Sequence, residues 1–186
     1  NNLKLKDEMI KKQNKIIELS QTNNTTIHNN LNINLYLNEH CKDAMNLTEF
    51  VNKINLSLED LFYTKKNGFI NGVSNIFIKH LEELEPTNRP ICCSDKKGTQ
   101  MYIKDDDKWE KDQNGKFENE INHMTKKHIE VLKEWETEHP NWKDSDKETQ
   151  VYMELVQKIM GGSNDTDREK NIKQIKRNVG KNTIIL

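Results

Sequence analysis

The sequence predicts an α+β fold that is mainly α-helical, with a small two- or three-stranded antiparallel meander packed on a long amphipathic helix. Two observations predict it. Apolar residues recur three and four positions apart through most of the chain, as they do on the buried face of helices. Residues 90–113, in contrast, combine short runs of strand-forming residues with turn-forming Gly and Asp.

The N-terminal segment, residues 1–20, has the periodicity of a coiled coil. Leu3, Ile10 and Ile17 are spaced by seven residues, and apolar side chains also stand at Met9 and Ile16. These five residues are the predicted interface of a coiled-coil stalk, and because the chain does not begin with Met we expect residues upstream of it. A surface helix packed on its own domain is the alternative, because so few heptads are visible.

An Asn-rich linker is predicted over residues 21–34, and we expect it to end in a short extended segment. The mainly helical C-terminal domain follows over residues 35–181, with a tail at 182–186. Two short helices are predicted at its start, over 46–55 and 57–64, because each begins at a residue type that favours helix N-caps.

Turns are predicted at Asn67-Gly68 and Asn71-Gly72. Apolar spacing and turn residues place the other elements, namely helices at 73–84, 117–139, 151–159 and 172–179, and strands at 91–93, 100–103 and 108–110. The helix over 117–139 has the most regular apolar spacing and is the one on which we expect the meander to pack, because a small sheet is not stable alone.

The composition excludes a strong attraction to polyanions. The chain has 29 basic and 30 acidic residues, a net charge of −1, so any nucleic-acid contact must be local. Its three cysteines are an odd number and indicate a reducing, intracellular compartment rather than a disulfide framework. No apolar run approaches the roughly 20 residues that span a bilayer, and we expect no membrane partner.

Motifs for catalysis, for cofactors and for structural zinc are missing, so we predict no catalytic residue, no cofactor and no metal. Two arrangements are alternatives to this prediction. A thiol nucleophile would join Cys92 or Cys93 to His123 or His128, but nothing local marks either cysteine as activated. A metal-dependent nuclease would use Asp95 with the acidic residues 105–107, although Asp at turns is explained by local hydrogen bonding.

Two sets of residues are candidate contacts. Lys173, Arg177 and Lys181 stand four apart on one helical stripe that can lie along phosphates, whereas a solvated helix face is the alternative. The candidate partner or oligomer contacts are the large aromatic residues Trp109, Trp135 and Trp142. Packing in the core is the alternative role for each of these.

Four stretches, in this order over residues 31–180, resemble the C-terminal region of C2H2-type zinc-finger-like proteins of giant eukaryotic DNA viruses (Mimiviridae and relatives). They read NLYLNEHCKDAMNLTEFVNKINLSLEDL, GFINGVSNIFIKHLEEL, RPICCSDKKGTQMYIKDDDKWEKD and VYMELVQKIMGG. In that family, fingers and a coiled coil precede this region. The resemblance implies a viral protein of the infected cell's cytoplasm or nucleus, or of the virion interior, with any fingers upstream of residue 1.

The function expected from these features is homo-oligomerisation, as a dimer or trimer, within a viral nucleic-acid-associated protein that has no catalysis of its own. Another viral protein is a second candidate partner, and nucleic acid is expected to bind mainly through the upstream region. A virion-associated structural adaptor and the nuclease are the alternative functions.

Overall fold

The computed structural model of the chain describes residues 33–113, 115–162 and 164–185. The chain divides into two units, residues 1–42 and 43–186, which are described separately. In the first unit, residues 33–40 are helical, so the extended segment predicted at the end of the linker is wrong at residues 33–35. The five residues of the predicted coiled-coil interface (Leu3, Met9, Ile10, Ile16 and Ile17) and the linker up to residue 32 lie outside the described residues.

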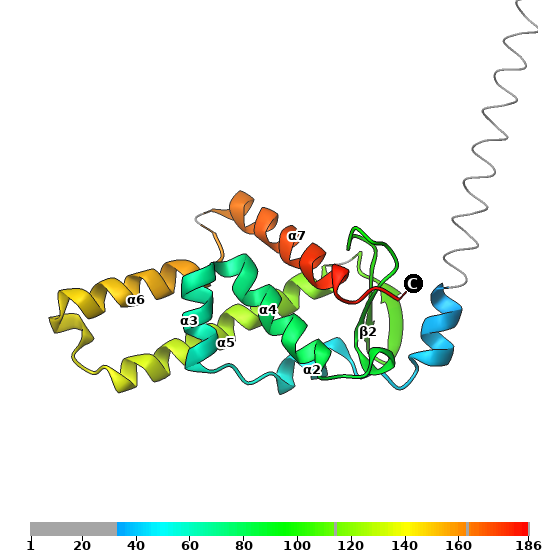
Figure 1. Cartoon of the computed structure of the whole chain (residues 1–186), viewed down its shortest axis with the longest axis horizontal. Coiled ribbons are helices and arrows are strands. Elements are labelled where there is room, and N and C mark those ends of the chain that lie inside the picture. Colours follow the sequence, from blue (N-terminus) through cyan, green and yellow to red (C-terminus); the bar gives the residue numbers. More distant parts are fainter. Residues whose placement is uncertain (1–32, 114, 163, 186) are drawn as a thin grey trace, which may run out of the picture. The chain divides into compact units, whose positions relative to one another are not determined.

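The second unit confirms the predicted α+β, mainly helical fold (Figure 1). It begins with two short helices, α2 (Leu47–Lys53) and α3 (Leu58–Asn67). Ser57 and Asp60 form a reciprocal capping box at the start of α3, which satisfies backbone N–H groups that the first turn leaves unbonded. Asn46 precedes α2 but does not cap it, because its side chain instead bonds to Asp107.

Helix α4 (Phe69–Glu82) begins before the predicted residue 73, so the turn predicted at Asn71-Gly72 is wrong. The only turn needed there is at Gly68, whose positive φ of 83° lets it join α3 directly to α4. Gly72 serves a different purpose, because an added Cβ atom would lie 2.2 Å from Oγ1 of Thr64 on α3. A short 3-10 helix, η1 (Pro86–Asn88), follows α4.

The predicted meander is a three-stranded antiparallel sheet of β1 (Ile91–Cys93), β2 (Met101–Asp105) and β3 (Lys108–Lys111) in that order. Asp106 and Asp107 both have positive φ, as a two-residue type I′ hairpin requires. The C-terminal tail docks on the sheet, because the N–H of Cys93 donates to Thr183 O at 2.9 Å and Ile184 bridges to Cys93 in parallel.

Three longer helices complete the unit: α5 (Lys116–Glu138), α6 (Asp146–Ile159) and α7 (Asp165–Lys181). All three were predicted, although α6 and α7 begin earlier than their apolar residues indicate. Ser145 and Asn164 cap these two helices, and their first turns are polar because they are solvated. A 3-10 turn, η2 (Trp142–Asp144), connects α5 to α6.

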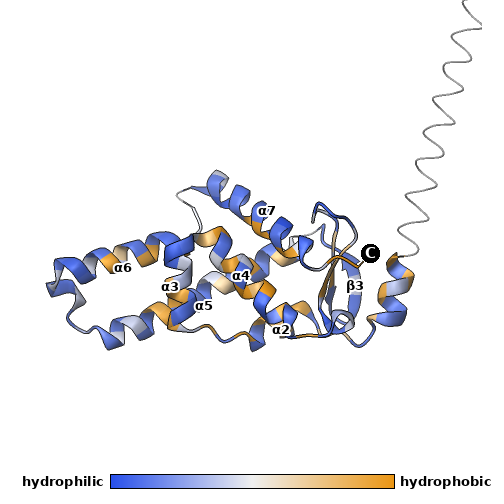
Figure 2. Cartoon of the chain, in the orientation of Figure 1, coloured by the Kyte–Doolittle hydropathy of each residue, from blue (hydrophilic) through white to orange (hydrophobic). Residues whose placement is uncertain are grey.

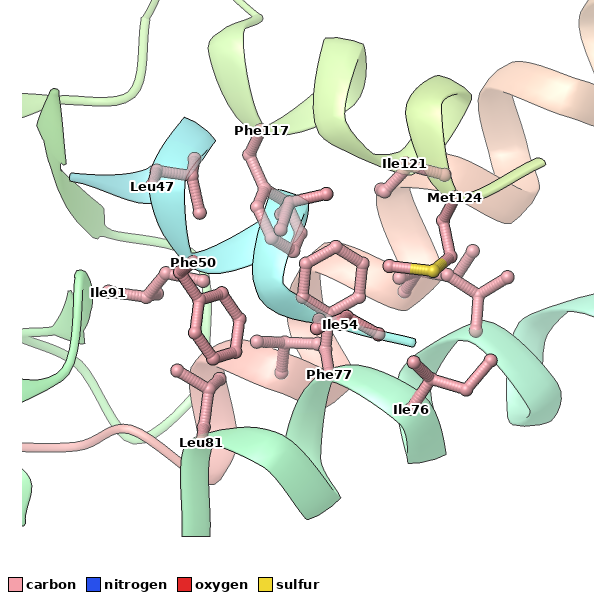
Figure 3. Close-up of a cluster of buried hydrophobic side chains, with 14 of the residues drawn as sticks. Leu47, Phe50, Ile54, Ile76, Phe77, Leu81, Ile91, Phe117, Ile121 and Met124 are labelled. Carbon is pink, nitrogen blue, oxygen red and sulfur yellow. The ribbon is translucent and has the colours of Figure 1, made fainter. Parts of the chain in front are cut away.

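Two hydrophobic clusters hold these elements together. The larger one joins α2, α4, α5, α7 and the sheet, so α2 and α7 cover the sheet together with the start of α5. Figure 3 shows its centre, where the ring of Phe77 lies 5.0 Å from that of Phe117 and 6.5 Å from that of Phe50. The smaller cluster joins α3, α5 and α6 around Leu61, Trp135 and Leu155.

His128 is a buried polar link between α5 and α3. Its Nδ1 lies 3.0 Å from Met124 O, and its Nε2 lies 3.1 Å from Thr64 Oγ1. A carbonyl oxygen only accepts, so Nδ1 of the neutral ring carries the hydrogen and donates to Met124 O. Nε2 is then an acceptor, and it shares the single proton of the Thr64 hydroxyl with Asp60 O, which lies 2.9 Å from Oγ1. Burial lowers the pKa of His128, and this outweighs the Met124 hydrogen bond and the charge of Asp60, which raise it.

The depressed pKa of His128 predicts loss of stability in mild acid. The unfolded chain takes up the proton near the ordinary pKa of 6.5, before the folded chain does. The stabilisation is therefore fully present above pH 6.5 and is lost as the pH falls toward the folded pKa, by at most about 1.4 kcal/mol per pH unit. Urea unfolding between about pH 5 and pH 7.5 measures this slope. The variant His128→Leu should show a shallower slope, and an equal slope contradicts the prediction.

Candidate phosphate-binding surface

The outer face of α7 carries the three cations that the sequence placed on one stripe. Lys173, Arg177 and Lys181 are all exposed, whereas the opposite face of the helix buries Ile175 and Val179. Figure 2 shows α7 as a mainly hydrophilic helix. The stripe therefore exists as predicted, and its geometry is that of a row of charges along one side of a helix.

Other basic residues of α7 have structural roles and do not belong to this stripe. The guanidinium of Arg168 bonds to Asn122 Oδ1 at 2.6 Å and to Met160 O, and it stacks over the ring of Phe69. The ammonium of Lys176 pairs with the carboxylate of Asp112, whose side chain is 1% exposed. These two cations hold α7 against the rest of the unit.

The loop between β1 and β2 adds two lysines to the stripe. Gly98, in this loop, packs against the backbone of α7: an added Cβ atom would lie 2.4 Å from Arg177 O and 3.0 Å from Lys181 N. The approach is mutual, because a Cβ atom added at Gly180 would lie 2.7 Å from Gly98 O. The exposed Lys96 and Lys97 directly precede Gly98, so the fold brings them to the C-terminal half of the stripe.

Asp95 fixes the shape of this loop. Its carboxylate accepts hydrogen bonds from Thr99 N at 2.8 Å, Thr99 Oγ1 at 2.7 Å and Gln100 N at 2.6 Å. Burial alone would raise the pKa of Asp95, but the hydrogen bonds from Gln100, Thr99 and Cys93 outweigh it and hold the pKa well below its ordinary value. The carboxylate of Asp95 is therefore hydrogen-bonded within the loop, whereas the side chains of Lys96 and Lys97 are exposed.

We call the five exposed cations of the loop and of α7 the basic surface; they are Lys96, Lys97, Lys173, Arg177 and Lys181. Among the described residues, four of them form no ion pair, and Lys173 only reaches Glu169 at 4.0 Å. An exposed pair at that distance contributes little, so it does not neutralise Lys173. The arrangement suits an extended anion with several negative groups, such as a phosphate backbone.

Sequence reasoning found the α7 stripe but missed the loop lysines. Lys96 and Lys97 stand about 80 residues before the stripe, and the packing of their loop against α7 brings them to it. Two glycines are the feature of the sequence that could have indicated this contact: Gly98 in a lysine-rich turn and Gly180 inside a helix. A glycine allows another backbone segment to approach closely.

The three tryptophans have different surroundings. Trp135 is 2% exposed, so it takes the core role that we considered beside the partner role. Trp142 is half-buried and stacks on Tyr152 with ring centroids 4.0 Å apart. Trp109 is also half-buried, on strand β3. Only the last two therefore keep surface that a partner can contact.

The acidic residues proposed for a nuclease do not form one site. Asp95 precedes β2, whereas Asp105 ends β2 and Asp106 and Asp107 follow it, so the two groups lie at opposite ends of this strand. Asp105 is bonded to Lys116 at 3.1 Å and to Thr48 at 3.3 Å. In the described part of the chain, no three His, Cys, Asp or Glu side chains gather closely enough to hold a metal ion.

The alternative pairing of Cys92 or Cys93 with His123 or His128 as a nucleophilic site is likewise not seen. Cys92 and Cys93 are buried, and burial raises the pKa of the Cys93 thiol, which keeps it protonated. His128 is bonded to Thr64 and Met124, and His123 lies 3.4 Å from Glu120.

Comparison with protein-family models, with curated proteins and with solved structures finds no match to this chain. Among the helices of the described residues, none is both long enough and apolar enough to cross a membrane.

Proposed function

We propose that this chain is a non-catalytic interaction domain that binds nucleic-acid phosphates through the basic surface of α7 and the β1–β2 loop. The observation that carries the proposal is the close backbone approach of Gly98 to Arg177 and Lys181, because the loop that carries Lys96 and Lys97 is thereby held against α7. A mobile loop would lose backbone freedom on binding, whereas a loop whose backbone is already held against α7 does not lose that freedom again.

The proposed binding is moderate in strength and depends on salt. Five cations can neutralise about five phosphates, and the resulting counterion release makes the affinity fall steeply as salt rises. The net charge of −1 means that the rest of the chain adds no attraction. A domain of this kind gains from self-association, because linked copies bind one nucleic acid at a high effective concentration.

The expected result is that reversing two cations of the basic surface weakens binding. In fluorescence anisotropy with labelled nucleic acid, Arg177→Glu with Lys181→Glu should lower the affinity at least about tenfold at low salt and reduce the salt slope by about two. Lys96→Glu with Lys97→Glu should do the same, because the proposal places these residues on the same surface.

The matched control is Lys126→Glu with Lys133→Glu. These two lysines are exposed on α5, stand seven residues apart and change the net charge by the same amount. Equal losses in all three double variants would show that only net charge matters, and unchanged binding in the first two would reject the basic surface.

Self-association is the second candidate function, and the heptad spacing of Leu3, Ile10 and Ile17 favours it. The proposed assembly is a homo-dimer or homo-trimer in a viral nucleic-acid-associated protein, as the resemblance of residues 31–180 implies. Light scattering at tens of micromolar chain measures the assembly, which should shrink to a monomer when Ile10 and Ile17 are both replaced by Asp. A wild-type chain that is monomeric at this concentration excludes self-association.

A further inference from the structure

A polar groove lies beside the basic surface, between α7 and the helices α3 and α4. It has a volume of about 320 Å³, and Tyr63, Asn75, Asn178, Lys181 and Asn182 are among the residues that line it. A second hollow, of about 490 Å³, shares Asn67, Asn71 and Asn178 with it. We call the first of these hollows the amide groove, because carboxamides line it from both sides.

The amide groove directs carboxamide oxygens away from the helices. The Nδ2 groups of Asn67, Asn71 and Asn182 donate to the backbone carbonyls of Tyr63, Asn67 and Asn178, at 2.9, 3.1 and 2.9 Å. A carbonyl only accepts, so each of these amide nitrogens faces its helix and each Oδ1 faces away from it. The side chain of Asn75 lines the groove and bonds to no other described residue, so both its donor and its acceptor are available.

The amide groove also offers a flat apolar surface and a positive charge. Tyr63 is 42% exposed, which leaves part of its ring for a ligand. Lys181 belongs to both the groove and the basic surface. On α7, Gln174 and Asn178 follow the cations Lys173 and Arg177 by one position each, so these carboxamides lie about 100° around the helix from the cations. Asn182 follows Lys181 directly after the helix.

These features match a nucleotide of a single strand. An aromatic ring stacks on a base, a carboxamide pairs with the edge of a base through one donor and one acceptor, and a lysine contacts the phosphate. Bases in a duplex are stacked and paired, so their edges do not enter a groove of this kind without being flipped out.

We propose that the chain binds single-stranded nucleic acid, with the phosphates on the basic surface and one base in the amide groove, stacked on Tyr63 and hydrogen-bonded to Asn75. The inference rests on the proposed function, because the basic surface must hold the strand for a base to reach the groove. The groove then supplies the preference for single strands that the cations alone do not give.

The experiment compares labelled single-stranded DNA, single-stranded RNA and duplex DNA of one length, with the full chain, by fluorescence anisotropy. The wild-type chain should bind at least one single strand more tightly than the duplex. Tyr63→Leu should weaken that binding about five- to tenfold and leave duplex binding unchanged. The stronger of the two single strands identifies the nucleic acid as DNA or RNA.

Phe62→Leu is the matched control, because Phe62 is the neighbouring residue, is 41% exposed and does not line the groove. It should bind as the wild type does. Asn75→Ala is a second variant that tests the groove without removing an aromatic residue, and it should weaken single-strand binding selectively. Thermal unfolding of each variant shows whether it is folded at the temperature of the binding measurement.

The outcomes separate this inference from the proposed function. If Arg177→Glu with Lys181→Glu weakens binding but Tyr63→Leu and Asn75→Ala do not, the basic surface stands and the base-binding groove is overturned. Equal losses for single strands and duplex in the two groove variants overturn it as well. If no nucleic acid binds the wild-type chain, the proposed function and the inference both fail.

Discussion

Replacing Gly72 with Ala should lower the free energy of unfolding by about 2 kcal/mol, although alanine is the better helix former. The added Cβ atom would lie 2.2 Å from Thr64 Oγ1 and 2.7 Å from Thr64 Cβ. Thr64 is β-branched, and its hydroxyl oxygen lies within hydrogen-bonding distance of Asp60 O and of His128 Nε2, so its side chain has little freedom to rotate away. The helices α3 and α4 must therefore move apart.

Two opposing effects decide the size of this loss. Alanine in place of glycine inside a helix gains about 1 kcal/mol. Forcing atoms into a packed contact costs about 1 to 3 kcal/mol, and here it also disturbs the bond between Thr64 and the buried His128. Because an approach of 2.2 Å cannot be relieved by rotating one methyl group, we expect the steric cost to exceed the gain.

Urea unfolding of Gly72→Ala and of the control Asn71→Ala tests the predicted loss. Asn71 is exposed in the same turn of α4, and its side chain bonds only to the backbone of Asn67. Its replacement should change the stability by no more than about 0.5 kcal/mol. A stabilised Gly72→Ala variant would show that α3 and α4 do not approach closely at this residue.

The sequence was a good guide where the signal was local. Apolar spacing identified α5, α6 and α7, and Ser57 marked the start of α3 with a capping box that the structure shows. The meander was predicted because strand-forming residues alternate with turn residues, and Asp106 and Asp107 form the hairpin turn between β2 and β3. In each case the cause of the structure lies within a few residues.

The predictions from the sequence were wrong where contacts between different elements decided the local structure. Asn71-Gly72 has the composition of a turn, but it lies inside α4 because Gly72 is needed for the approach to Thr64. Asn46 is of a residue type that favours helix N-caps, but its side chain bonds to Asp107 in the hairpin turn. Local propensity cannot express either contact, because each is made with another element: Thr64 lies on the preceding helix, and Asp107 is 61 residues from Asn46.

The candidate site shows the same division. The stripe of Lys173, Arg177 and Lys181 follows from helical geometry and was predicted. The amide groove and the loop lysines were not predicted, because they require α4 and the β1–β2 loop to lie on either side of α7. Asparagine is also frequent throughout this chain, so no single asparagine indicated the groove.

Replacing Gly98 with Ala should cost about 3 kcal/mol of stability and should also weaken nucleic-acid binding. Gly98 has a φ of +71°, a conformation that costs an L-residue about 1 to 2 kcal/mol. In addition, the new Cβ atom would lie 2.4 Å from the carbonyl oxygen of Arg177, which is backbone and cannot rotate aside. The loop must then move away from α7 and carry Lys96 and Lys97 with it.

Gly115→Ala is the control that isolates the conformational strain. Gly115 has a φ of +69°, and the nearest atom to an added Cβ is Glu118 Oε2 at an ordinary 3.7 Å. It should cost only about 1 kcal/mol and leave binding unchanged. The excess loss in Gly98→Ala, in urea unfolding and in anisotropy below its melting temperature, therefore measures the contact between the loop and α7.

A loss of stability together with a loss of nucleic-acid affinity in Gly98→Ala distinguishes a loop that positions Lys96 and Lys97 for binding from a loop that only lies near α7. If the loop only happened to lie near α7, Gly98→Ala would lose stability but would bind nucleic acid as Gly115→Ala does. If the loop is held there to position Lys96 and Lys97, Gly98→Ala should weaken binding. The loss of affinity should equal the amount by which Lys96→Glu with Lys97→Glu loses more affinity than the charge-matched control, Lys126→Glu with Lys133→Glu. Because the alanine variant keeps all five cations, such a loss can only come from their displacement.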